Sequence, residues 1–222
     1  MGYGMQFNFF VVLSFLIAVG SFTWGSFALL KKKRPMYFRL FVFAAGCFAL
    51  HQLSTIVSVW CGIVPSMSIG AFSIFGAEFF LLSANFGTLD RLVDDGQNTK
   101  KARQLSWLAP LGIAVLAVFE FLAWVKEDIF TAEMWVIIAI PAAAASYFNL
   151  KHLLLPTDAF GLLQATRYCN ASALLFYLLT AAYVIVSSTG RTVLSGLHLV
   201  MMSLAVFGMT VSAIKGSEKW GI

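Results

Sequence analysis

The sequence predicts an all-α, polytopic membrane protein that folds as a bundle of seven transmembrane helices. Hydrophobic residues make up 60% of the 222 residues and charged residues only 11%, which is more apolar surface than one soluble core of this size can bury. The apolar residues also gather in long stretches, and Lys and Arg fall almost entirely on one side of the resulting topology. This composition excludes a soluble enzyme, a nucleic-acid-binding protein and a disordered chain.

The spans follow from the thickness of a bilayer. A hydrocarbon core about 30 Å thick requires roughly 20 apolar residues per helix. The connecting loops are too short to fold separately, so residues 1–222 are expected to form a single integral membrane domain. The seven predicted spans are Phe7–Leu30, Met36–Ile63, Ile69–Val93, Leu105–Val125, Met134–Leu155, Ala165–Ser188 and Val193–Ile214.

The first three spans are distinguished by what flanks or fills them. The first is a retained anchor and not a signal peptide, because its apolar run is long, no basic residue precedes it, and Lys31–Arg34 (KKKR) follows it. The second carries a histidine, His51, in its interior. The third is rich in phenylalanine, which can wall an apolar pocket or face lipid, and the spacing does not discriminate between these two roles.

The last four spans contain features that bear on packing and on chemistry. The fourth carries Glu120 near its outer end. The fifth carries Pro141 followed by four alanines, a pattern that favours close helix approach or a kink. The sixth contains Asn170. The seventh contains no lysine, so a retinal Schiff base in this helix is not expected.

The distribution of positive charge predicts the orientation. With the N-terminus outside, 13 of the 15 Lys and Arg residues fall on the cytoplasmic side, and only Lys126 and Arg191 lie outside. Because cytoplasmic loops carry an excess of Lys and Arg, we expect an outside N-terminus, a cytoplasmic C-terminus and a location in the cell (inner) membrane. The net charge of +5 is thereby explained without nucleic acid as a partner.

Ionisable side chains are costly inside a bilayer, by roughly 2.5 to 3.5 kcal/mol on insertion scales, and therefore mark candidate sites. At about 1.5 Å of rise per residue, His51 is expected about 18 Å and Glu78 about 13 Å below the outer surface. Glu120 and His198 enter from the same side. Together with Gln52, these residues are the candidate ligand-binding or proton-binding group, in an outward-open cleft whose centre is a His51–Glu78 pair.

Each member of this group also has a structural interpretation. His51 can donate a hydrogen bond to a neighbouring helix, and Glu78 must be protonated or paired if it is buried. A second polar cluster is expected toward the cytoplasm, where amides bond across helices and fix their packing. Its members are Asn85, Asn149, His152 and Asn170.

No cofactor, metal or catalytic residue is predicted. The three cysteines, Cys47, Cys61 and Cys169, lie in apolar stretches without CxxC or Cys/His ligand spacing. HExxH and nucleophile-elbow motifs are missing. His51 and His198 differ by roughly 10 Å in expected depth, which does not suit a haem pair. An enzymatic function is therefore disfavoured.

The layout of a basic first loop, a histidine in the second span and seven helices with short loops resembles the seven-helix sensor modules of some bacterial signalling proteins. The resemblance implies a plasma-membrane sensor or receptor that binds an unknown small ligand in its outer half. Because this sequence contains no kinase or cyclase domain, we expect such a sensor to act through a cytoplasmic or membrane protein partner. The expected contact segments are Asp94–Gln104 or Gly216–Ile222. The alternatives are a small secondary transporter or channel with a proton-coupled carboxylate, and a subunit of a larger membrane complex.

Overall fold

The computed structural model contains helices and no strands over the residues that it describes, which are 5–62, 69–86, 100–126, 128–155, 162–188 and 192–219. The helices are α1 (Met5–Lys31), α2 (Met36–Cys61), α3 (Ile69–Ala84), α5 (Lys100–Ser106), α6 (Leu108–Trp124), α7 (Ile129–Leu154), α8 (Leu162–Ser188) and α9 (Thr192–Lys219). The predicted all-α class is confirmed.

Several helices have the dimensions of membrane spans. Five segments are long and apolar enough to cross a membrane, and α3 is a shorter apolar helix. The five are Phe9–Lys31, Met36–Ser58, Lys100–Trp124, Ile129–Leu154 and Val193–Glu218. The chain therefore has the character of a multi-pass membrane protein.

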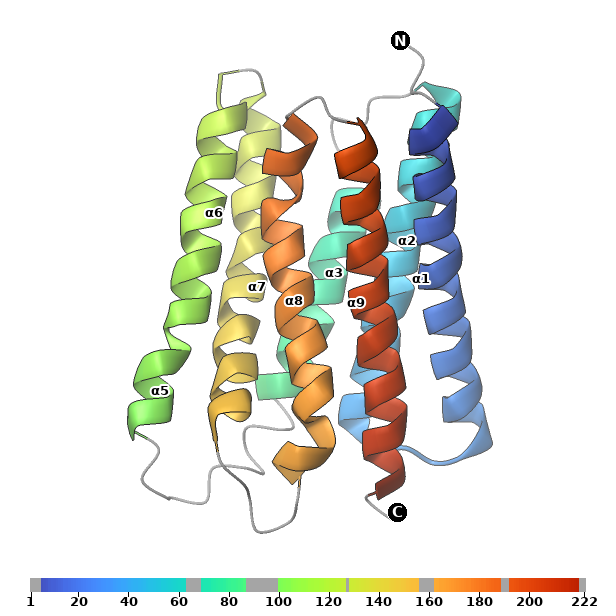
Figure 1. The fold of residues 1–222 in the computed structure, drawn as a ribbon, viewed down its shortest axis with the longest axis vertical. Coiled ribbons are helices and arrows are strands. Elements are labelled where there is room, and N and C mark those ends of the chain that lie inside the picture. Colours follow the sequence, from blue (N-terminus) through green and yellow to red (C-terminus); the bar gives the residue numbers. More distant parts are fainter. Residues whose placement is uncertain are drawn as a thin grey trace.

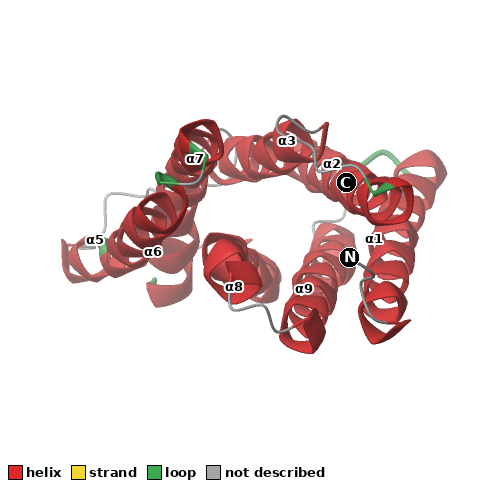
Figure 2. Cartoon of the chain, turned by 90° about the horizontal axis from the view of Figure 1, so that it is seen from above, coloured by secondary structure: helices red, strands yellow, loops and turns green. Residues whose placement is uncertain are grey.

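The helices form a closed two-row bundle. The first helix begins at one end of the bundle and α9 finishes at the opposite end (Figure 1). Seen along the bundle, α7, α3 and α2 lie in one row and α8 and α9 in a facing row, with α6 and α1 at the two ends (Figure 2). Because α6, α7 and α8 contact one another and α3 contacts α7, these four helices enclose the interior at one end of the two rows.

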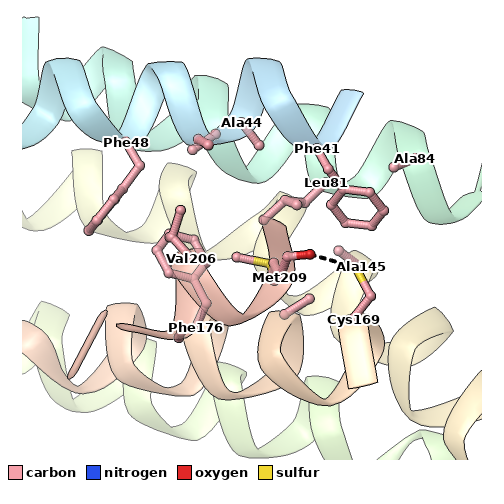
Figure 3. Packing of buried hydrophobic residues seen from close by; sticks show 14 of the residues in the cluster. Phe41, Ala44, Phe48, Leu81, Ala84, Ala145, Cys169, Phe176, Val206 and Met209 are labelled. Carbon is pink, nitrogen blue, oxygen red and sulfur yellow. Dashed lines mark hydrogen bonds between the residues drawn. The ribbon is translucent and has the colours of Figure 1, made fainter. Parts of the chain in front are cut away.

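The interior is packed with aromatic, aliphatic and small side chains. Phe48 of α2 meets Phe176 of α8 edge to face, with ring centroids 5.3 Å apart. Deeper in the same cluster, the Cys169 thiol donates to the Met209 carbonyl oxygen across a distance of 3.7 Å (Figure 3). Large apolar side chains cover the outside as well, as at Leu30, which is 83% exposed. Such a surface requires an apolar solvent, which a bilayer provides.

Several helix ends differ from the predicted spans for identifiable reasons. Helix α7, which corresponds to the fifth predicted span, begins at Ile129 and not at Met134. Asp128 caps this helix because it accepts hydrogen bonds from the backbone N–H groups of Phe130 and Thr131. The last helix continues past Ile214 to Lys219. Its end is held to the first connection by Arg34, whose guanidinium donates to the Ser217 hydroxyl at 2.7 Å and lies 3.5 Å from Glu218.

Some predicted features fall outside the described residues. These are residues 87–93 of the predicted third span, residues 94–99 of the proposed partner-binding loop, and residues 220–222 at the C-terminus. The last two described residues of the third span, Asn85 and Phe86, are π-helical. Turns of this kind are rare and are often found at functional sites.

Candidate functional site

Two buried carboxyl groups, Glu78 of α3 and Glu120 of α6, border one small cavity inside the bundle. Its volume is about 10 Å³, which is close to the minimum that one water molecule requires. Helices α7 and α8 supply the rest of its wall. The other lining residues are Trp135, Ile138, Ala139, Ala142, Thr180 and Ala181.

Both carboxyls point inward because each occupies the buried face of its helix. On α3, Ile74, Glu78 and Leu81 are buried at a spacing of three to four residues, while Phe79 is half exposed on the other side. Ile113, Ala117 and Glu120 repeat this spacing on α6. Since residues three and four apart share one helix face, each carboxyl continues a stripe of apolar and small residues that faces the interior.

The environment of the pair does not accommodate two negative charges. Glu78 is 0% exposed and Glu120 1% exposed, and neither oxygen of Glu78 has a hydrogen-bond partner. The described residues that line the cavity include no basic side chain. The Thr180 hydroxyl donates its hydrogen to the Phe176 carbonyl oxygen at 3.0 Å. Two carboxylates in one apolar cavity repel each other strongly, so the pair requires at least one proton or a bound cation.

The donor set does not suit a metal ion. The lining provides two carboxyls and one hydroxyl, without histidine or cysteine. Ca²⁺ takes six to eight oxygen ligands and zinc favours nitrogen and sulfur. Among the residues that the structure describes, no group of three or more His, Cys, Asp or Glu side chains is placed to hold a metal. A proton is the simplest occupant of this site.

The predicted His51–Glu78 pair is not what the structure shows. His51 Nδ1 donates to the Gly70 carbonyl oxygen at 3.0 Å, and its ring stacks on Phe48. Gly70 lies eight residues before Glu78, about 12 Å along the helix, and His51 does not line the carboxyl cavity. The prediction fails because α3 begins beside the middle of α2, so the two helices are offset along their axes. The partner of Glu78 in the cavity is Glu120.

The two remaining outer candidates, Gln52 and His198, do not line the cavity. Gln52 is fully buried, and neither atom of its amide has a hydrogen-bond partner. His198 Nε2 donates to the Leu179 carbonyl oxygen at 2.7 Å. Its ring centroid is 5.9 Å from that of Tyr183, which in turn lies 6.3 Å from that of Trp135 in the cavity wall. The rings of Tyr183 and Trp135 therefore lie between His198 and the cavity.

The three amides of the second predicted cluster are buried but make few hydrogen bonds. The Asn85 amide donates to the Leu81 carbonyl oxygen at 3.2 Å, while its oxygen has no hydrogen-bond partner. In Asn149 and Asn170, neither amide atom has one. His152 is buried in the same part of α7. The expectation that these amides lock the helices together by direct bonds is therefore not what the described contacts show.

Sequence reasoning missed Tyr177. This side chain is fully buried, it interacts electrostatically with Glu78, and it lies beside the Asn149 amide without meeting hydrogen-bond geometry. Tyrosine in a span is commonly assigned to the interfacial aromatic belts. The available signal was its position, three residues before Thr180 and near the middle of the sixth span.

Comparisons of this chain with protein-family models, with curated proteins and with solved structures find no match.

Proposed function

We propose that this chain is a proton-binding membrane transport protein, in which Glu78 and Glu120 form a proton-binding site within the bundle. In this proposal α3 and α8 complete seven crossings of the plasma (inner) membrane, with the N-terminus outside. The carrying observation is the pair of fully buried carboxyls around one cavity whose described lining holds no basic side chain. Intramembrane carboxyls of this kind are typical of proton relays in pumps and transporters.

The size of the cavity favours a proton over a larger ligand. Small-molecule pockets usually enclose about 300–1,000 Å³, whereas this cavity encloses about 10 Å³. Among the described lining side chains, only the two carboxyls and Thr180 offer an oxygen atom to a monovalent metal cation. Proton binding needs no further ligands, because one bound proton removes the repulsion between the two carboxyls.

The helix that forms one wall of the cavity has a point at which it can bend. Pro141 lies inside α7, between the lining residues Ala139 and Ala142. Proline removes one hydrogen bond of the helical ladder and is a common cause of kinks. Bending at this level would change access to the carboxyls, which alternating exposure to the two sides of a membrane requires.

One observation favours a second candidate, a sensor for an apolar ligand. A groove of about 290 Å³ between α6 and α7 is lined by apolar side chains, among them Phe121, Val136 and Ile140. Ala139 lines both this groove and the carboxyl cavity. An apolar molecule entering from the bilayer would therefore lie one side chain away from the proton site.

Proton flux into reconstituted vesicles tests the proposal. The purified chain is placed in liposomes that contain a pH-sensitive dye, and a potassium gradient with valinomycin drives proton entry. We expect flux with the natural sequence and its loss with Glu78→Gln and with Glu120→Gln. Glu133→Gln is the matched control, since Glu133 is exposed near the start of α7. Absence of flux in the natural sequence contradicts proton transport and favours the sensor. Flux that depends on Na⁺ without acidification also contradicts proton transport and indicates a metal-cation transporter instead.

A further inference from the structure

A run of buried polar side chains extends from the carboxyl pair toward the end of the bundle where α9 finishes. Building on the proposed function, we propose that the pair exchanges protons with the end that carries Arg34 and the C-terminal end of α9, through a hydrated column formed by Tyr177, Asn149, Asn85 and Asn170. These four residues are called the polar column below. All four are 0% exposed, and each has at least one polar atom without a hydrogen-bond partner.

The column starts at the cavity. Tyr177 lies one turn of α8 from Thr180, which lines the cavity, and its hydroxyl is within electrostatic range of Glu78. The same hydroxyl lies beside the Asn149 amide. A phenol can donate and accept hydrogen bonds at once. Tyr177 is therefore placed to pass a proton between the carboxyl pair and the next polar group.

The column then reaches amide side chains on three helices. Asn149 follows Ala142 by seven residues on α7, and Asn85 follows Glu78 by seven on α3, about 10 Å further along in each case. The two are at one level, because their chain neighbours Phe148 and Phe86 have ring centroids 5.3 Å apart. Asn170 precedes Tyr177 by the same seven residues on α8.

Beyond these amides, the proposed path leads to a cation at the end of α9. The Cys169 thiol, next to Asn170 in the chain, donates to the Met209 carbonyl oxygen of α9 at 3.7 Å, eight residues before Ser217. Arg34 is largely buried and is held by Ser217 and Glu218 at the end of α9. In the opposite direction the cavity wall contains the ring of Trp135, packed against Tyr183, and the buried Gln52 amide does not line the cavity. The described polar groups therefore favour exchange at the Arg34 end.

The chemistry of the column is proton relay through hydrogen bonds. Buried amide and phenol groups without protein partners are normally bonded to internal water. A proton leaving Glu78 joins one end of such a chain while another leaves the far end, so that each water and the Tyr177 hydroxyl break one O–H bond and form one. The amides keep their own protons and orient the water. No oxidant or further reactant is needed.

Two substitutions remove links of the column without touching the carboxyls. In the liposome assay we expect Tyr177→Phe and Asn149→Leu each to slow proton flux about tenfold, a change that corresponds to about 1.4 kcal/mol on the barrier. Tyr168→Phe is the matched control, because Tyr168 lies on the same helix and is 76% exposed. Asn149→Ser retains a group that can bond water and should restore most of the flux.

A second measurement separates the column from the site. The infrared band of a protonated carboxyl, assigned by its loss in Glu78→Gln, should persist in Tyr177→Phe, since that variant keeps the proton site. If the natural sequence carries protons and Glu78→Gln does not, yet both column variants match Tyr168→Phe, the column is wrong and the proposed function stands. If the natural sequence carries no protons, the proposed function itself fails. A column variant that loses both flux and the band contradicts a relay role and indicates a structural one.

Discussion

Replacing Glu78 by an apolar side chain of similar size should stabilise the fold while abolishing proton flux. Methionine matches the unbranched shape of glutamate and repacks readily. Glu78 is fully buried, and neither of its oxygens has a hydrogen-bond partner, which is a cost of about 1–3 kcal/mol for a buried polar group. The Glu78→Met variant removes that cost and should be about 2 kcal/mol more stable.

The cavity itself changes this figure little. A volume of about 10 Å³, at about 24 cal/mol per Å³, corresponds to only about 0.2 kcal/mol. For a chain of this length each kcal/mol shifts Tm by about 2–4 °C, so Glu78→Met should raise Tm by about 4–8 °C. The polar term, and not the void, therefore decides the sign.

Thermal unfolding in detergent, followed by tryptophan fluorescence, measures this shift. Glu133→Met provides the control, because Glu133 is exposed and surface substitutions usually change stability by less than about 0.5 kcal/mol. A fall in Tm for Glu78→Met, with no change for Glu133→Met, would mean that Glu78 makes a stabilising polar contact, and the reasoning would be refuted.

Three further predictions concern caps, packing and topology. Hydrogen bonds from the Thr131 hydroxyl and backbone N–H hold the pKa of Asp128 below its usual range. The Asp128 carboxylate therefore stabilises the fold at pH values above its pKa in the unfolded chain, and this stabilisation is lost as pH falls through its pKa in the folded chain. Asp128→Ala should weaken the acid dependence of Tm. A Cβ at Gly196 would lie 2.7–2.8 Å from Phe10 side-chain carbons, so Gly196→Ala should destabilise by about 1–3 kcal/mol, whereas Gly112→Ala, with open space around it, should not. Cys61 is exposed, and a membrane-impermeant maleimide added to intact cells should label it if the N-terminus is outside; labelling only after lysis would reverse the orientation.

Hydropathy predicted where the helices lie but not how their ends are fixed. The fifth predicted span began at Met134, where the apolar run becomes continuous, and the helix begins five residues earlier at Ile129. The reason is local and can be read in the sequence, where Thr131 follows Asp128 by three residues. The Thr131 hydroxyl donates to Asp128 Oδ2 at 2.6 Å, and this contact caps the helix. A polar loop composition concealed the start of the helix.

Helical rise predicted that Glu78 lies within the membrane, but it could not identify the neighbour of Glu78. The loop between α2 and α3 is short, yet Gly70 at the start of α3 lies beside His51, ten residues before the end of α2. Loop length limits which helices are adjacent and does not fix their offset along the axis. Glu120, in the next predicted span, reaches Glu78 because α6 and α3 both border α7. That adjacency is a property of the folded bundle and has no local signal.

The position of the carboxyls is difficult to explain by folding alone. Leucine or methionine at residues 78 and 120 would continue the apolar stripes of α3 and α6 without the cost of burying a carboxyl. The small side chains of Ala139 and Ala142 leave space between the two carboxyls that larger residues would fill with more contacts. This site has both a small void and buried carboxyl oxygens without hydrogen-bond partners, and each of these features lowers stability. Such features are expected where a residue is kept for its function. Proton binding supplies a reason for both features, because the carboxyls must be able to lose a proton and the space must admit water.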